Sequence, residues 1–274
     1  MLYGPPGTGK TYLAKRLARA LAHDDPERFA IVQFHPSSSY EDFIEGLRPV
    51  LADAGQITYE LQPGPLVRMA DRAAANPDQT FVLVVDEINR ANLPKFFGEL
   101  LFLLEYRDEK VQPLYRQGET FTLPKNLWFI GTMNTADRSV ALIDAAMRRR
   151  FHFVPFFPGQ GTMAGLLERW LERHQRPAAI AGFVAAVNAE LRSSLGDHLL
   201  LGPSFFMKAD LSEPAVERIW QYNVFPFLEE QFWGRQDEIE HWSWPAVRAR
   251  HWVPAHSPAI APPDDLRPAA ESET

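Results

Sequence analysis

The 274-residue sequence contains no cysteine, which excludes disulfide bonds and thiolate-bound metal sites. A chain without cysteine suits a reducing compartment, so we expect a cytoplasmic protein. There is also no run of about 18 apolar residues, the length that crosses a bilayer as a helix, and we expect no membrane span. Basic residues are not in excess, because the formal net charge is −7. The bulk charge therefore does not favour a nucleic-acid-binding surface.

A glycine-rich run stands at the start of the chain. It matches the phosphate-loop pattern G-x-x-x-x-G-K-[ST] through Gly4, Pro5, Pro6, Gly7, Thr8, Gly9, Lys10 and Thr11. The glycines let the backbone bend so that its N–H groups can converge on phosphate oxygens. The lysine supplies a charge to the β- and γ-phosphates, and the threonine hydroxyl that follows it can bind Mg²⁺. Apolar residues then recur at helical spacing, so the loop opens onto a helix N-terminus, which favours an anion.

Little sequence precedes this loop. A phosphate loop normally follows a buried strand, and typical strands have about five or six residues. Here only Met1, Leu2 and Tyr3 come before Gly4. We therefore expect the first strand to be truncated, either because the start is placed too late or because the sequence is a fragment of a longer chain.

Two adjacent carboxylates follow a short apolar run. Residues 81–85 are typical of a strand buried on both faces, and Asp86 and Glu87 stand at its carboxyl end, where open α/β sheets bind their ligands. We expect Asp86 to hold Mg²⁺ through its water shell and Glu87 to orient and polarise the attacking water. Asn134 follows a second apolar strand, residues 127–132. It is placed to hold that water or the γ-phosphate, although a lone asparagine there could equally be a turn residue.

Three arginines, residues 148–150, end a short helix predicted over 142–147. They could simply offset the helix dipole. We favour a role across a subunit boundary, because an arginine from a neighbouring subunit commonly neutralises transition-state charge. Nuclease chemistry in this chain is not expected. Asp78 and residues 108–110 mimic a nuclease spacing, but Asp78 precedes the strand that carries Asp86.

The sequence pattern predicts an α/β nucleotide-binding domain over residues 1–155, with a parallel sheet, and a small all-helical second domain over 156–240, which the resemblance given below makes a lid. A C-terminal extension over 241–274 is expected to be disordered towards its end. Within the first domain we expect a strand over 29–34, a hairpin in 47–65 and a helix over 66–75. A helix over 93–106, a second hairpin in 107–124 and a last strand over 151–154 follow.

Together these features resemble an AAA+ ATPase module, and three runs narrow the match. Asp-Glu-Ile-Asn-Arg-Ala-Asn (86–92), Met-Asn-Thr-Ala-Asp-Arg-Ser (133–139) and Met-Arg-Arg-Arg-Phe (147–151) look like the motor subunit of the McrB family. That family powers modification-dependent restriction. Gly-Pro-Ser-Phe-Phe-Met (202–207) is similar to the lid motif of the same family. The resemblance covers about residues 1–235.

The resemblance implies a homo-oligomeric ring, expected to be a hexamer, with GTP or ATP and Mg²⁺ bound between neighbouring subunits. It implies that Asn134 positions the water and that Asp137 and Arg138 support Asn134 at the subunit boundary. It also implies that Arg148 and Arg149 reach into the site of the neighbouring subunit. It also implies a McrC-like nuclease partner, with DNA contacted indirectly through that partner or a missing N-terminal domain. The base preference cannot be read from these residues, because a phosphate loop binds phosphates and not the base.

Two alternatives stay open. A MoxR-like chaperone or remodelling ATPase shares the run Asp-Glu-Ile-Asn-Arg-Ala (86–91) but usually has a different sensor segment. A truncated fragment that binds nucleotide without hydrolysing it would follow if the missing first strand weakens the site.

Overall fold

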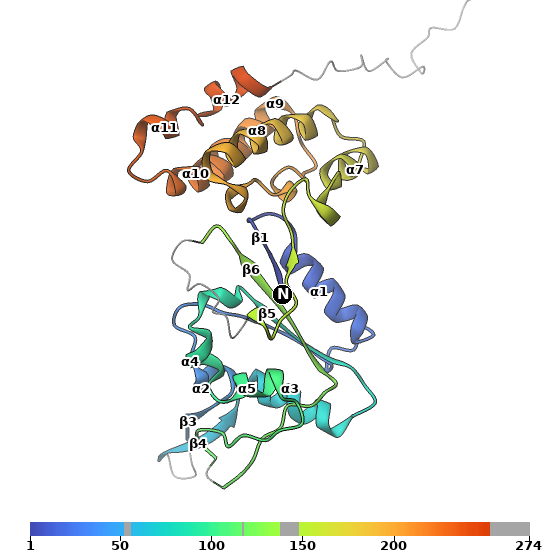
Figure 1. Ribbon diagram of the computed structural model, residues 1–274, viewed down its shortest axis with the longest axis vertical. Coiled ribbons are helices and arrows are strands. Elements are labelled where there is room, and N and C mark those ends of the chain that lie inside the picture. Colours follow the sequence, from blue (N-terminus) through green and yellow to red (C-terminus); the bar gives the residue numbers. More distant parts are fainter. Residues whose placement is uncertain (52–55, 117, 138–147, 253–274) are drawn as a thin grey trace, which may run out of the picture.

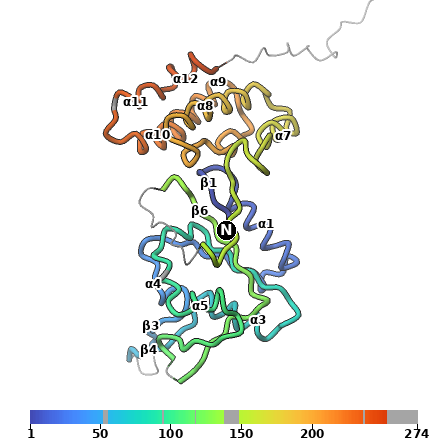
Figure 2. Tube along the Cα trace, viewed as in Figure 1, coloured from blue at the N-terminus to red at the C-terminus, as the bar shows by residue number. Residues whose placement is uncertain are grey.

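The computed structural model describes residues 1–51, 56–116, 118–137 and 148–252. It has an α/β unit and a helical lid, and the trace crosses from one to the other between β7 (Val154–Pro155) and α7 (Leu166–Arg173) (Figures 1 and 2). The turn between β1 and α1 lies at the end of the α/β unit that faces the lid (Figure 1). Within the described residues no helix is long and apolar enough to cross a membrane.

A five-stranded parallel sheet, in the order β2-β5-β6-β1-β7, forms the centre of the α/β unit. Its strands are β1 (Leu2–Gly4), β2 (Phe29–Gln33), β5 (Phe81–Asp86), β6 (Leu127–Asn134) and β7 (Val154–Pro155). We expected the residues before the phosphate loop to be too few for a central strand. They nevertheless form β1, because β6 and β7 pair with it on both sides and supply hydrogen bonds that a short strand could not gain alone.

Strand β5 is buried on both faces, as predicted for a parallel sheet. Val82 and Val84 pack in a cluster with Ala14 and Ala18 of α1 (Lys10–Leu21). The alternate residues of the strand lie in a separate cluster with α3 (Pro65–Ala75) and the helices after β5. This alternation fixes the register of β5, and with it the position of the carboxylates at its end.

The other elements of the α/β unit are α2 (Tyr40–Phe43), an antiparallel hairpin of β3 (Glu45–Leu51) and β4 (Ile57–Pro63), and a 3₁₀ turn, η1 (Ile88–Arg90). The hairpin expected in 47–65 is therefore present. The single helix predicted over 93–106 is wrong, because the structure has two helices, α4 (Leu93–Phe97) and α5 (Leu100–Glu105). Gly98 separates them with φ +50°, a conformation that breaks the run of helical hydrogen bonds.

The second hairpin, predicted in 107–124, is also wrong. In the described part of this segment Val111 and Phe121 form one isolated antiparallel bridge. Side chains hold the segment instead: Arg116 pairs with the buried Glu45 at 2.5 Å, and the Tyr115 hydroxyl donates to Glu41 at 2.8 Å. Contacts to distant elements, which local sequence does not show, replace the strand pairing that the pattern predicted.

The lid contains α7 (Leu166–Arg173), α8 (Ala179–Leu195), α9 (Glu213–Ile219), a π-helix η5 (Trp220–Val224), α10 (Phe225–Gln231), α11 (Gln236–Glu240) and α12 (Trp244–His251). Its core includes Trp242, Trp244 and Val247. The packed unit therefore extends beyond the predicted boundary at residue 240, because these side chains from the expected extension are buried in the lid core. The predicted fold class, a parallel α/β unit with a helical lid, is confirmed.

The lid touches the phosphate loop through a 3₁₀ turn, η4 (Pro203–Phe205). The Ser204 N–H donates to the Gly7 carbonyl oxygen at 3.0 Å. A Cβ atom added at Gly202 would lie 2.1 Å from the Gly7 carbonyl carbon and 2.4 Å from the Pro6 oxygen. The two backbones thus approach so closely that position 202 has room only for hydrogen.

We expect Gly202→Ala to lower the free energy of unfolding by about 1–3 kcal/mol, because the added methyl group meets backbone that cannot move aside cheaply. Urea unfolding measures this change. Gly182→Ala is the matched control, since a Cβ at Gly182 in α8 meets nothing within 4 Å. That variant should gain up to about 1 kcal/mol from helix propensity. Equal stability of the two variants would contradict the close contact.

Candidate nucleotide-binding and catalytic site

The phosphate loop curves around the ammonium group of Lys10, the first residue of α1. Gly7 and Gly9 adopt φ +74° and +83°, which turn the backbone as a side chain would not allow. Lys10 Nζ donates to the carbonyl oxygens of Gly4 at 3.0 Å and Pro5 at 2.8 Å. The positive charge is therefore held inside the loop, next to the N-terminus of α1.

Asp86 ends β5 beside this loop. Its Oδ1 accepts hydrogen bonds from two hydroxyl groups, Thr11 Oγ1 at 2.6 Å and Thr132 Oγ1 at 2.5 Å. The first donor comes from α1 and the second from β6, so three elements meet at one carboxylate oxygen. Asp86 and Thr11, the two residues predicted to hold Mg²⁺, are therefore in direct contact.

Glu87 and Asn134 also meet, because β5 and β6 are neighbours in the sheet. Asn134 Nδ2 donates to Glu87 Oε1 at 2.5 Å. The backbone of Glu87 is left-handed, with φ 55° and ψ 42°, which is unusual for a residue other than glycine. Glu87 Oε2 is buried and has no hydrogen-bond partner in the described part of the chain, so the protein leaves its accepting capacity unused.

Burial is the main cause of two pKa shifts in the site. Burial raises the pKa of the Glu87 carboxyl, and the negative charges of Asp137 and Asp86 add to that effect, while Arg90 and Lys10 partly offset it. Burial lowers the pKa of the Lys10 ammonium to about 8, against the opposing effect of nearby carboxylates. A carboxylate with a raised pKa is a stronger base, which suits the predicted role of Glu87.

Asp137 lies close to this group. It pairs with Arg90 at 3.1 Å, so the residues that follow β5 are joined to those that follow β6. Its predicted support of Asn134 at the subunit boundary stays a prediction. Arg138, predicted to act with it, lies outside the described residues, as does the helix predicted over 142–147.

The three arginines have different surroundings. Arg148 lies 5.8 Å from the Phe153 ring, and Arg149 Nε lies 3.7 Å from a carboxylate oxygen of Glu105. Both are exposed, whereas the Arg150 side chain is 9% exposed and pairs with Glu105 at 2.9 Å. Arg148 and Arg149 therefore lie at the surface, and the contacts described for them are with Phe153 and Glu105.

The prediction missed three residues that contact the site. Thr132 contacts Asp86, Arg90 pairs with Asp137, and Asn89 Nδ2 donates to the Asn134 carbonyl oxygen at 3.0 Å. Asn89 and Arg90 belong to the run over 86–92 on which the family resemblance rests, but the sequence predicted no role for either residue. Thr132 was counted as an ordinary strand residue, and a hydroxyl at the carboxyl end of a central strand was the available signal.

The donor atoms fit a magnesium ion. Mg²⁺ prefers oxygen ligands and is usually held by one or two protein groups together with substrate phosphates. Thr11 Oγ1 and Asp86 Oδ1 supply such oxygens 2.6 Å apart, beside a loop shaped to hold phosphate. Thr11 and Asp86 would therefore hold the ion.

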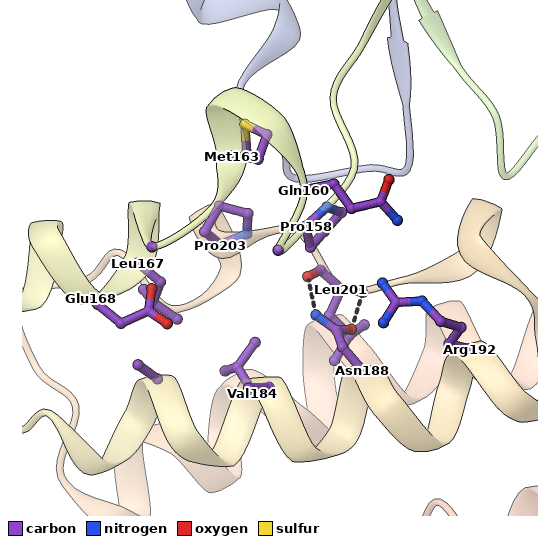
Figure 3. Close-up of a pocket in the computed structure, with 14 residues that line it drawn as sticks. Pro158, Gln160, Met163, Leu167, Glu168, Val184, Asn188, Arg192, Leu201 and Pro203 are labelled. Carbon is purple, nitrogen blue, oxygen red and sulfur yellow. Dashed lines mark hydrogen bonds between the residues drawn. The ribbon is translucent and has the colours of Figure 1, made fainter.

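A separate cavity of about 250 Å³ lies in the lid (Figure 3). The linker through Pro158 and Gln160 lines it together with side chains of α7 and α8. In α8, Asn188 exchanges two hydrogen bonds with the backbone of Leu201, as Figure 3 shows. None of the predicted site residues lines this cavity, so it is distinct from the site described above.

Comparison with known proteins gives two family matches. Residues 1–151 match the AAA domain (dynein-related subfamily), and residues 179–240 match the McrB alpha-helical lid domain. Over 261 residues the chain is 35% identical to the type IV methyl-directed restriction enzyme EcoKMcrB subunit of Escherichia coli K12, covering 89% of this chain and 56% of that protein. The chain thus spans about half the length of that relative.

Two further similarities are weaker. The type II restriction enzyme BsuMI component YdiS of Bacillus subtilis 168 is 27% identical over 266 residues, which cover 82% of this chain and 75% of that protein. A crystal structure of a proposed ATPase from Cytophaga hutchinsonii is 20% identical, covers 60% of this chain and 43% of that one, and gives a TM-score of 0.39. A score of that size supports no conclusion about this chain.

The pKa of Lys10 predicts a pH dependence of nucleotide binding. The lysine is charged below about pH 8 and loses its proton above it, so we expect affinity for a fluorescent nucleotide to fall as pH rises through that value. Titrations between about pH 6.5 and about pH 9.5 measure this. Lys10→Arg stays charged over the whole range and should bind without the step. An affinity for the unmodified protein that is constant up to about pH 9.5 would contradict the expectation.

Proposed function

This chain belongs to the AAA domain family, in its dynein-related subfamily, and on that premise we propose that it hydrolyses a nucleoside triphosphate. The hydrolysis, of GTP or of ATP, drives a ring-shaped motor that works with a McrC-like nuclease in the restriction of modified or foreign DNA. One observation carries most of this proposal: the phosphate loop, Asp86, Glu87 and Asn134 converge. The lid match to McrB favours restriction among the functions of such motors.

The geometry suggests a role for each residue in the reaction. Lys10 and the N-terminus of α1 hold the phosphates, and Asn134 orients Glu87. Glu87 accepts a proton from water through its unpaired Oε2 as the water oxygen attacks the γ-phosphorus and the bond to the leaving diphosphate breaks. A bound Mg²⁺ supplies positive charge that stabilises the phosphate oxygens.

Arg148 and Arg149 are proposed to complete the site of a neighbouring subunit. Both are exposed and make their described contacts with Phe153 and Glu105, not with their own phosphate loop. A guanidinium that enters from a neighbour can stabilise the charge that develops on the transferring phosphoryl group. This arrangement makes hydrolysis depend on assembly, which is the reason to propose a ring, expected to be a hexamer.

The partner and the DNA contact are proposed from the relatives. Both curated relatives are named as parts of restriction enzymes, and the net charge of −7 gives this chain no basic excess. Cleavage and most DNA contact are therefore assigned to a McrC-like subunit or to an N-terminal DNA-reading domain. A MoxR-like remodelling ATPase is the second candidate, because MoxR-like ATPases share the run over 86–91 with the McrB family.

Glu87→Gln tests the catalytic assignment. We expect it to lower turnover of the preferred nucleotide by at least about 100-fold, because the amide cannot accept the proton, while nucleotide affinity changes little. Steady-state hydrolysis of GTP and ATP, side by side and with a McrC-like subunit added, measures this. Glu60→Gln, at an exposed position on β4, is the control. GTP turnover supports the restriction motor, and ATP turnover alone moves the proposal to a remodelling ATPase. No turnover of either nucleotide contradicts both.

A mixing experiment tests the arginines. The double variant Arg148→Ala/Arg149→Ala and the variant Glu87→Gln should each be inactive alone. Mixed in equal amounts, they should regain about a quarter of the unmodified activity. Random assembly places a subunit with an intact Glu87 next to a neighbour with intact arginines at about one interface in four. Turnover of the mixture measures the recovery. If the arginines act on the nucleotide of their own subunit, mixing restores nothing.

A further inference from the structure

We propose that Thr132 is a positioning residue for hydrolysis. Its hydroxyl group orients both the side-chain carboxylate of Asp86 and the backbone of Glu87. The proposal rests on the hydrolysis proposed above. Thr132 lies on β6 and is 2% exposed. Its Oγ1 accepts a hydrogen bond from the Glu87 N–H at 3.2 Å and donates one to Asp86 Oδ1 at 2.5 Å.

The two bonds engage the hydroxyl proton and one of its lone pairs. The direction of donation is determined, because an ionised carboxylate can only accept and a backbone N–H can only donate. Thr132 also pairs with Leu2 in the β1–β6 register, so the strand that enters the phosphate loop holds it in place. The hydroxyl thereby connects the loop strand to both carboxylates at the end of β5.

Glu87 needs this support because of its backbone. Its left-handed conformation costs free energy for a residue with a Cβ. Its N–H comes directly after the last residue of β5 and bonds to Thr132, so this bond helps to hold the conformation. Without it the backbone at Glu87 can relax, and the carboxylate turns away from Asn134 and from the phosphate side of the site.

Asp86 depends on the same group. Its Oδ1 accepts hydrogen bonds from Thr11 and Thr132, and these donors belong to two different elements, α1 and β6. Loss of the Thr132 donor leaves Thr11, among the described residues, as the remaining side-chain donor to this carboxylate. Groups that orient a metal-binding residue commonly change metal affinity or activity by about 10–100-fold when they are removed.

Thr132→Val and Thr132→Ser separate this role from packing. Valine fills the same buried volume and removes both hydrogen bonds, whereas serine keeps the hydroxyl and loses a methyl group. We expect the valine variant to lose at least about tenfold in kcat, with KM for nucleotide changed by less than about threefold. The serine variant should stay within about threefold of the unmodified kcat. Thr58→Val, at an exposed position on β4, is the control.

A second readout does not need turnover. Binding of a non-hydrolysable fluorescent nucleotide is titrated with Mg²⁺, and the valine variant should need at least about tenfold more Mg²⁺ for half-maximal binding, while serine should not. Equal behaviour of valine and the unmodified protein in both assays overturns the proposal, as does a serine variant as impaired as valine. If the unmodified protein turns over no nucleotide, the proposed hydrolysis fails, and the Mg²⁺ titration still decides the role of Thr132.

Discussion

The acceptance of two hydroxyl hydrogen bonds by one oxygen of Asp86 is the interaction on which the site depends. Thr11 belongs to the phosphate loop helix and Thr132 to β6, so a single carboxylate fixes the loop, β5 and β6 relative to one another. The parallel order β5-β6-β1 brings these groups together, because parallel strands end at the same edge of a sheet. A change in register of any of the three strands would separate them.

The lid is coupled to this site through backbone contact. Gly202 and Ser204 lie against the carbonyl groups of the phosphate loop, and the lid core behind them is closed by large side chains such as Trp220 and Trp242. A displacement of the phosphate loop would therefore press on the lid backbone at Gly202 and Ser204, which is a physical route from the nucleotide site to the lid.

The pKa values of Glu87 and Lys10 are shifted in opposite directions. Partial burial raises the pKa of Glu87, and the neighbouring carboxylates add to that effect, whereas burial lowers the pKa of Lys10 to about 8. Both shifts have burial as their main cause, so the same exclusion of water that strengthens Glu87 as a base also weakens the retention of charge on Lys10. A phosphate group bound to the loop would restore that charge.

The sequence by itself determined the phosphate loop, the paired carboxylates, Asn134 and the α/β-plus-lid architecture, because each has a local signal in residue type and spacing. It also suggested the family through short runs around those residues. Only the tertiary structure decided what distant contacts control, such as the role of Thr132, whose hydroxyl group acts only because β6 lies beside β5. The same holds for the segment 107–124, which Glu45 and Glu41 hold in place of strand pairing, and for the burial of Trp244 in the lid. Local propensity cannot report these features, because the partners lie up to about seventy residues away and are brought close by the fold.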